Sequence, residues 1–234
     1  PTGLDSARRM HFMRRLLLGV VFLNLTAIGF GSVSLYRSYR ENIRAAELRT
    51  RNLAEAADKA ISALVDKIDV ALRNVADELE QQLIAGGIHE DRSNAFIGRQ
   101  LRRVQDIDGI RVANARGEAF LGPGTSQSPH ASYADRDFFA IHRDHADAGL
   151  IVTKPIVGRI SKKWVLSFNR RFNYPDGSFA GVVSATVTIP VLRKVFSTFD
   201  MGPKGLMTIR TQDDLSLVIR HPEVINGKSL EIGN

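Results

Sequence analysis

The spacing of apolar residues predicts one long helix over residues 41–84, a stretch that contains neither Gly nor Pro. Its apolar positions are separated by steps of 4, 4 and 3 residues, which repeat every 11 residues and favour a nearly straight helix over a left-handed coiled coil. A helix of these 44 residues would be about 66 Å long. Its apolar stripe must be covered by a sheet or by a twin helix, and Gly86-Gly87 ends it. The stripe consists of Leu53, Ala57, Ile61, Leu64, Ile68, Leu72, Val75, Leu79 and Leu83.

A second pattern precedes this helix. Residues 16–36 are 21 residues without a charge, bracketed by Arg14-Arg15 and Arg37. As a helix they would span roughly 31 Å, the thickness of a bilayer core. A cleaved signal peptide is the alternative, but its apolar region is usually shorter and is followed by an Ala-x-Ala-like site. We therefore expect an uncleaved membrane anchor, with residues 1–15 as a cytoplasmic tail. Because the chain starts at Pro1 and not at Met, we also expect a fragment.

Beyond Gly87 the pattern changes from helical to alternating. A helix is predicted over 91–105, strands over 107–113 and 118–121, and a loop rich in Gly, Pro and Ser over 122–129. A helix over 137–146 and a strand over 150–157 follow, with Pro155 indicating an edge or a bulge. A hairpin joins 163–174 to 179–188, and a helix over 190–199 leads to a last strand pair, 205–211 and 215–221.

The hairpin allows a prediction of register. Its four-residue loop, 175–178, would place Asn169 opposite Ser184 and Ser167 opposite Thr186. Apolar side chains would then share one face of the sheet and polar ones the other. We expect the apolar face to cover the long helix. The polar face, which includes Arg171, lines a cavity or is open to water.

The stretch 131–139 also allows two interpretations. Asp135 is a good helix N-cap, and the free N–H groups at the helix start together with Arg136 could bind a small anion. The alternative is a structural helix, with Phe138 and Phe139 in the core and Arg136 paired with a neighbouring acid.

Composition removes several classes of function. The first 36 residues supply +3 of the net charge of +7, and the rest is spread without a basic block, so we expect no nucleic-acid partner. The absence of Cys excludes disulfides, Cys-ligated zinc and thiol nucleophiles. His142 and His145 are spaced to share a metal, but no third ligand is apparent. We find no catalytic constellation and therefore expect no enzyme activity in these residues, no metal and no cofactor.

Five segments, in this order after one membrane helix and one long helix, resemble the double Cache (PDC-type) extracytoplasmic sensor domain of bacterial signalling proteins. They are residues 133–139, 154–159, 161–164, 170–171 and 176–183. The resemblance covers about residues 37–234. It implies an α+β fold in which a long helix carries a membrane-distal PAS-like antiparallel sheet that holds a small ligand, followed by a smaller PAS-like lobe.

With the resemblance, the predicted domains are a cytoplasmic tail (1–15), a transmembrane helix (16–36), a stalk helix (37–88), a ligand-binding lobe (89–200) and the start of a proximal lobe (201–234). Localisation would be the inner membrane, with the sensor periplasmic and a homodimer formed through the long helix. The output would be a diguanylate cyclase or, as the alternative, a histidine kinase. A membrane-anchored periplasmic enzyme or adhesion module is the alternative of a different class.

The predicted ligand-binding residues are Tyr133, Arg136, Phe138, Phe139, Ser167, Asn169, Arg171, Ser184 and Thr186. One branch of the resembled family binds amino acids through a motif that includes a Tyr and two Asp residues. Here Ile156 stands in place of the Tyr, and Gly158 and Thr186 stand in place of the two Asp residues. A buried ammonium without an acidic partner is costly. From this departure we expect an organic acid or another small anion, and no α-amino acid.

Overall fold

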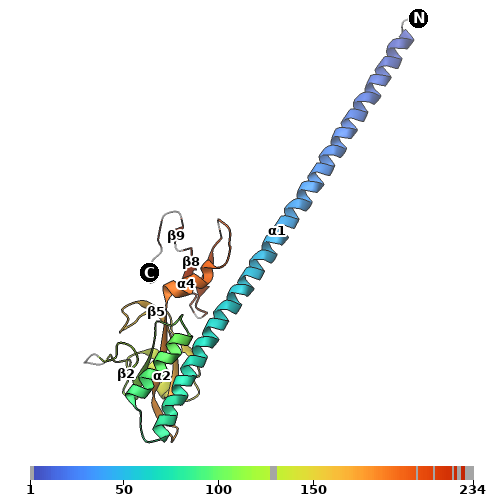
Figure 1. The fold of residues 1–234 in the computed structure, drawn as a ribbon. Coiled ribbons are helices and arrows are strands. Elements are labelled where there is room, and N and C mark those ends of the chain that lie inside the picture. Colours follow the sequence, from blue (N-terminus) through green and yellow to red (C-terminus); the bar gives the residue numbers. More distant parts are fainter. Residues whose placement is uncertain are drawn as a thin grey trace. The chain divides into compact units, whose positions relative to one another are not determined.

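The computed structural model describes residues 3–126, 131–203, 205–212, 214–222, 224–225 and 228–229. The end of the predicted Gly/Pro/Ser loop, residues 127–129, therefore lies outside the described residues, as does much of the chain after residue 222. The chain divides into two units, Pro1–Glu55 and Ala56–Asn234, which are described separately. Figure 1 shows the order of the elements along the chain.

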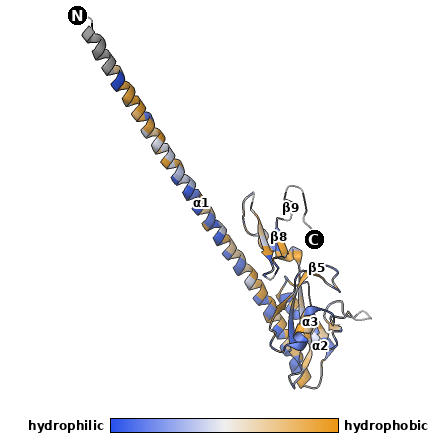
Figure 2. Ribbon diagram, turned by 180° about the vertical axis from the view of Figure 1, so that it is seen from behind, coloured by the Kyte–Doolittle hydropathy of each residue, from blue (hydrophilic) through white to orange (hydrophobic). Residues whose placement is uncertain are grey.

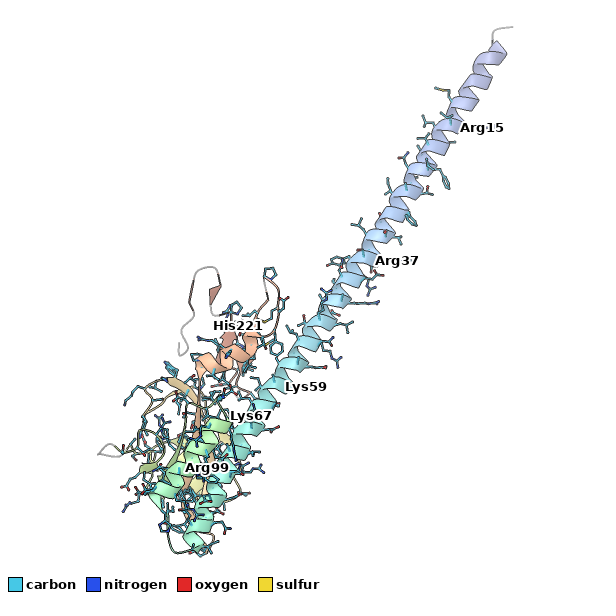
Figure 3. All side chains as sticks on the ribbon, viewed as in Figure 1. Arg15, Arg37, Lys59, Lys67, Arg99 and His221 are labelled. Atoms are coloured by element: carbon cyan, nitrogen blue, oxygen red, sulfur yellow. The ribbon has the colours of Figure 1, made fainter. Side chains whose placement is uncertain are left out.

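The first unit is helical and belongs to α1 (Gly3–Ile84), which includes both the predicted membrane segment and the predicted long helix. Its apolar side chains, Phe22 and Phe30 among them, are exposed. The turns between Arg15 and Arg37 are coloured as hydrophobic in Figure 2, and Figure 3 labels these two arginines. By length and composition this helix can cross a membrane.

The second unit is built on an antiparallel sheet with the strand order β2-β1-β6-β5-β3, and β4 also pairs with β5. The predicted strand over 150–157 is split in two, because Pro155 has no N–H to continue a ladder. The strands are β1 (Gly109–Asn114), β2 (Ala119–Leu121), β3 (Ile151–Val152), β4 (Ile156–Val157), β5 (Trp164–Asn173) and β6 (Phe179–Thr188).

The predicted hairpin register is confirmed. In the β5–β6 pair, Asn169 lies opposite Ser184 and Ser167 lies opposite Thr186. Since side chains alternate between the faces of a strand, this register places Leu166, Phe168 and Phe172 together on the other face.

That apolar face packs against the C-terminal part of α1, as predicted. Ile68, Leu72, Val75 and Leu79 of the helix are almost fully buried in one cluster with the apolar residues of β5 and β6. Beside α1, α2 (Glu90–Arg103) completes this layer (Figure 1), and Ser93 of α2 donates a hydrogen bond to Gln82 of α1. The sheet covers the stripe of the long helix within this unit.

An ion pair joins the same two layers. Arg170 of β5 donates two hydrogen bonds to Asp69 of α1, one of them 3.0 Å long. Burial by itself would raise the pKa of Asp69, but the hydrogen bond and charge of Arg170, helped by Arg73, lower it. Asp69 is therefore ionised at neutral pH and fixes the helix against the strand.

The opposite face of the sheet is covered by α3 (Asp137–Asp144) and the chain that leads into it. A second, smaller apolar cluster lies on this face, on the opposite side of the sheet from α1. Its buried members are Ala113, Ala119, Tyr133, Phe138, Phe139 and Val182.

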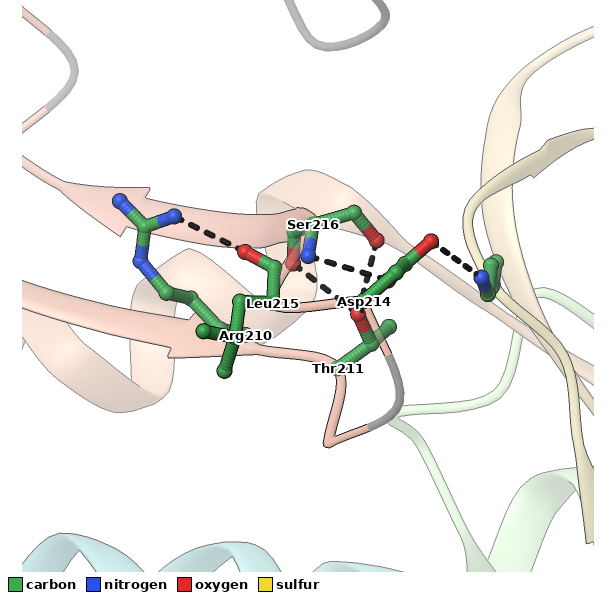
Figure 4. A network of polar contacts seen from close by, with 6 residues as sticks. Arg210, Thr211, Asp214, Leu215 and Ser216 are labelled. Carbon is green, nitrogen blue, oxygen red and sulfur yellow. Dashed lines mark hydrogen bonds and ion pairs between the residues drawn. The ribbon is translucent and has the colours of Figure 1, made fainter.

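After β6, α4 (Ile189–Ser197) leads to a small two-stranded sheet, β7 (Met207–Arg210) and β8 (Leu217–His221). The short pair β9 (Val224–Ile225) and β10 (Lys228–Ser229) follows. Figure 4 shows the turn between β7 and β8, where Asp214 accepts hydrogen bonds from Thr211 and from the N–H of Ser216. Asp214 also forms an ion pair with Lys154, which lies between β3 and β4, at 2.6 Å. The hydrogen bond from Lys154 is the largest cause that lowers the pKa of Asp214, and the hydrogen bond from Thr211 is the next largest.

Truncation of the buried stripe tests this packing. Leu72→Ala should lower the free energy of unfolding by about 2–5 kcal/mol, because it leaves a cavity between α1 and the sheet. Val70→Ala is the matched control, since Val70 is exposed on the same helix and should change the stability little. Urea unfolding measures both, and equal effects of the two changes would contradict the described packing.

Candidate functional site

A small cavity lies between the polar face of the sheet, the start of α3 and the segment that contains β4. Its volume is about 30 Å³, which is room for one water molecule. The walls combine guanidinium groups, hydroxyl groups and a few apolar side chains. They are Arg111, Tyr133, Arg136, Phe138, Ile156, Gly158, Arg159, Val165, Ser167, Ser184 and Thr186.

Six of the nine predicted site residues line this cavity. The structure brings together Tyr133, Arg136, Phe138, Ser167, Ser184 and Thr186, which come from the α3 region, β5 and β6. It does not bring Phe139, Asn169 or Arg171 to the cavity wall.

Arg171 points away from the cavity and holds the neighbouring backbone. It donates to the carbonyl oxygens of His142 at 2.8 Å and Gly177 at 3.2 Å, and it lies over the ring of Phe179. Phe139 packs edge-on against the same ring, with 5.3 Å between the ring centroids. Both residues contact Phe179, and neither lines the cavity.

Asn169 is fully buried and positions two hydroxyl groups of the wall. Its Oδ1 accepts hydrogen bonds from Ser167 at 2.9 Å and Ser184 at 2.7 Å. Its Nδ2 donates to the carbonyl oxygens of Ile151 and Ser167. The side-chain amide therefore has partners on both ends and fixes the positions of the Ser167 and Ser184 hydroxyl groups.

The sequence reasoning missed Arg111 of β1. Arg111 lies opposite Ser184 and is only 6% exposed. Its Nε donates to the carbonyl oxygen of Pro123 at 3.1 Å, and its Nη1 donates to Thr186 Oγ1 at 3.2 Å. Neither partner carries a charge. An arginine in the middle of an apolar strand was a signal that could have drawn attention to Arg111. Its place in the cavity could not be predicted, because its partner Thr186 of β6 is 75 residues away in the sequence.

Arg136 and Asp135 do not have the predicted capping arrangement. The N-cap of α3 is Arg136, in an extended conformation and without a side-chain cap, so the prediction that Asp135 caps the helix is wrong. Asp135 instead forms an ion pair with Arg159, which lowers the pKa of its carboxyl group. The Arg136 guanidinium donates to the carbonyl oxygen of Val157 at 3.2 Å.

Tyr133 lies among three arginines. Burial raises the pKa of its hydroxyl group, and the charges of Arg111, Arg136 and Arg159 oppose that rise. The phenol is therefore neutral at physiological pH and can donate a hydrogen bond. Its ring packs edge-on against Phe138, with centroids 6.0 Å apart.

Behind the wall, His142 is completely buried. Its Nε2 lies 3.0 Å from the carbonyl oxygen of Asn169, and its Nδ1 has no hydrogen-bond partner. Burial lowers the pKa of His142, a hydrogen bond with Asn169 opposes this, and the nearby charges of Arg170 and Arg171 lower it further. His142 is thus neutral in the folded protein. Within the described parts of the chain, no three His, Cys, Asp or Glu side chains gather to hold a metal ion.

No protein-family model matches the sequence, and no curated protein matches it. Solved structures do. The extracellular domain of rpHK1S-Z16, described as a histidine kinase, is 24% identical, with a TM-score of 0.62 over 77% of this chain and 75% of that chain. The ligand-binding domain of the Campylobacter jejuni chemoreceptor Tlp3, in complex with 4-methylisoleucine, is 11% identical, with a TM-score of 0.59 over 77% and 75%.

The ligand-binding domain of the Pseudomonas fluorescens chemoreceptor CtaA, in complex with L-alanine, is 14% identical, with a TM-score of 0.59 over 79% and 76%. At these identities the similarity establishes the fold. The chain has the mixed helix and sheet fold of extracellular sensor domains, which confirms the predicted fold class. The Tlp3 and CtaA structures are ligand-binding domains of chemoreceptors.

The exclusion of α-amino acids is wrong. Domains of this fold hold 4-methylisoleucine and L-alanine in Tlp3 and CtaA. The exclusion assumed that an ammonium requires carboxylates at positions 158 and 186. An ammonium has three donors, which hydroxyl and backbone carbonyl oxygens can also satisfy. Ser167, Ser184 and Thr186 place such hydroxyl oxygens on the cavity wall.

The buried His142 predicts a pH dependence of stability. Because its folded pKa lies below the ordinary value of about 6.5, the unfolded chain takes up its proton first as the pH falls. The stability from this residue should be complete above that value and decline below it, by up to about 1.4 kcal/mol per pH unit. Urea unfolding at several pH values should show a shallower decline for His142→Gln than for the unaltered chain.

The matched control is His145→Gln, since His145 is exposed one residue after α3. It should keep the pH dependence of the unaltered chain. A decline of the same slope in all three proteins would contradict the assignment to His142.

Proposed function

We propose that residues 37–234 are the extracytoplasmic ligand-sensing domain of a signalling protein that residues 16–36 anchor in the inner membrane. We further propose that the arginine-lined cavity of the larger sheet binds a small molecule with a carboxylate group, amino acids included. One observation carries the proposal: the polar face of the β5–β6 hairpin, Arg111 and Arg136 line the same small cavity.

The cavity favours a carboxylate for physical reasons. Guanidinium groups bind carboxylates through charge-assisted, often bidentate hydrogen bonds. Tyr133 and the hydroxyl groups of Ser167 and Ser184 supply further donors and acceptors. The amino acids in the Tlp3 and CtaA complexes carry the same group, which supports this ligand class.

The walls must separate for such a ligand, since sites for small molecules have volumes of a few hundred Å³. The wall around β4 is the candidate to move. It is held by two contacts that a ligand carboxylate can replace, Arg136 with Val157 and Arg159 with Asp135. Lys154, two residues before β4, is paired with Asp214 of the small sheet, so a displacement of this wall would reach the second lobe.

The output of the whole protein would be a cytoplasmic enzyme. The protein rpHK1S-Z16, whose extracellular domain is similar to this chain, is described as a histidine kinase, which supports a kinase output. A diguanylate cyclase is the other output that the sequence favours. Ligand-dependent autophosphorylation of the whole protein supports the kinase, and ligand-dependent synthesis of cyclic di-GMP supports the cyclase.

Replacement of Arg136 tests the site. Arg136→Gln should weaken the binding of carboxylate ligands by about 10- to 100-fold, because a hydrogen bond to a charged group contributes about 1.5–3 kcal/mol. Thermal shifts of the 234-residue chain in detergent, with each common amino acid, measure this. Arg99→Gln is the control, since Arg99 is exposed on α2 and does not line the cavity. Unaltered shifts in Arg136→Gln would contradict the assignment of the site.

A further inference from the structure

The cavity contains more positive charge than its own residues neutralise. Of its three arginines, Arg159 is paired with Asp135. Arg111 and Arg136 have no acidic group within ion-pair distance in the part of the chain that the structure describes; their hydrogen bonds go to uncharged oxygens of Pro123, Thr186 and Val157. The buried guanidinium of Arg111 therefore faces one small space without an acidic partner. The half-buried guanidinium of Arg136 has only the nearby carboxylate of Asp135, which is itself paired with Arg159.

Arg111 is held in this position by the surrounding structure. Gly109 makes room for its guanidinium, because a Cβ atom at Gly109 would lie 2.8 Å from Nη1 and 3.0 Å from Cζ. Thr186 and the carbonyl oxygen of Pro123 then fix Nη1 and Nε from two sides. A flexible surface arginine would have none of these restraints, so the orientation of Arg111 towards the cavity is a property of the fold.

A buried charge without a counterion is costly, and the cost is recovered when an opposite charge binds. We infer that the ligand of this cavity carries two carboxylate groups, one bound by Arg111 and the other by Arg136. This inference rests on the proposed function and specifies its ligand. Arg111 is then the residue that determines specificity for the second carboxylate.

A ligand with one carboxylate fits the charges less well. If Arg136 takes that carboxylate, Arg111 stays buried without a counterion, and the ammonium of a neutral amino acid adds a third positive charge. A second carboxylate supplies the counterion of Arg111. The charge of the ammonium then remains with an acidic amino acid, and no excess charge remains with a dicarboxylate. The ligand can be an acidic amino acid, whose ammonium would bind Ser167, Ser184 or Thr186, or a dicarboxylate without an ammonium. The two share the chemistry that Arg111 recognises.

Calorimetric titration of the 234-residue chain in lipid nanodiscs tests the inference. L-aspartate, L-glutamate and succinate are the probes with two carboxylates. L-asparagine and L-glutamine are nearly isosteric probes with one carboxylate. At least one of the first three should bind with a dissociation constant about tenfold or more below those of the amides. A factor of about ten corresponds to the contribution of one charge-assisted hydrogen bond. Succinate against L-aspartate then separates a dicarboxylate site from an acidic amino acid site.

Arg111→Gln gives the second measurement. It removes the charge but keeps a side chain that can donate to Thr186. The preference for two carboxylates should fall to less than threefold, because the hydrogen bond from Arg111 to the second carboxylate is lost. L-asparagine should bind within about threefold of its affinity for the unaltered chain, because its single carboxylate is still bound by Arg136. The melting temperature without ligand should stay the same or rise, because an uncompensated charge has been removed. A purely structural Arg111 would lower it. Arg99→Gln should keep both the preference and the melting temperature.

The outcomes separate the inference from the proposed function. Amides that bind as tightly as the acids overturn the inference and leave the sensor proposal in place. A preference that persists in Arg111→Gln overturns the role of Arg111. No binding by any of the five probes overturns the inference, and no binding by any amino acid or succinate overturns the proposed function as well. The titrations of the unaltered chain decide the ligand class even if a variant fails to fold.

Discussion

The pairing of Asn169 with Ser184 is the constraint on which the rest of the second unit depends. This register sends Leu166, Phe168 and Phe172 to the face that packs on α1, and Ser167, Ser184 and Thr186 to the opposite face. A slip by one residue would exchange the two sets and place hydroxyl groups against the helix. Asn169 resists that slip, because its amide holds both serines by hydrogen bonds. Fold and site are thus determined by the same strand pair.

The two faces use charge in opposite ways. On the α1 face, Arg170 is matched with Asp69, and the pair fixes a helix against a strand. On the cavity face, Arg111 and Arg136 meet uncharged oxygens. Such a local departure from good charge pairing is expected where a protein sacrifices stability for binding. The contrast within one sheet is the physical basis for assigning the binding role to the cavity face.

The sequence predicted what depends on local periodicity and short connections. The long helix, the hairpin register and the opposite faces of the sheet follow from spacing along a few neighbouring turns. Arg111 could not be found in this way, since its place opposite Ser184 arises from the pairing of β1 with β6, which are far apart in the chain. The alternation of side chains along β5 places Arg171 on the same face as Ser167. It does not line the cavity, however, and binds backbone oxygens of α3. Asp135 is a residue type that often caps helices, but its carboxylate forms an ion pair with Arg159 instead.

The exclusion of amino acids failed for a similar reason, because it considered two acidic positions and not the whole set of hydrogen-bond acceptors around them. The cavity face is expected to bind the ligand through Arg111, while the α1 face remains structural. The NMR signals of the arginine Nε–H groups in the presence of saturating L-aspartate, L-glutamate or succinate test this most directly. The Arg111 signal should shift, and the Arg170 signal should stay unchanged. A bound ligand that leaves Arg111 unchanged, or shifts both signals equally, would contradict it.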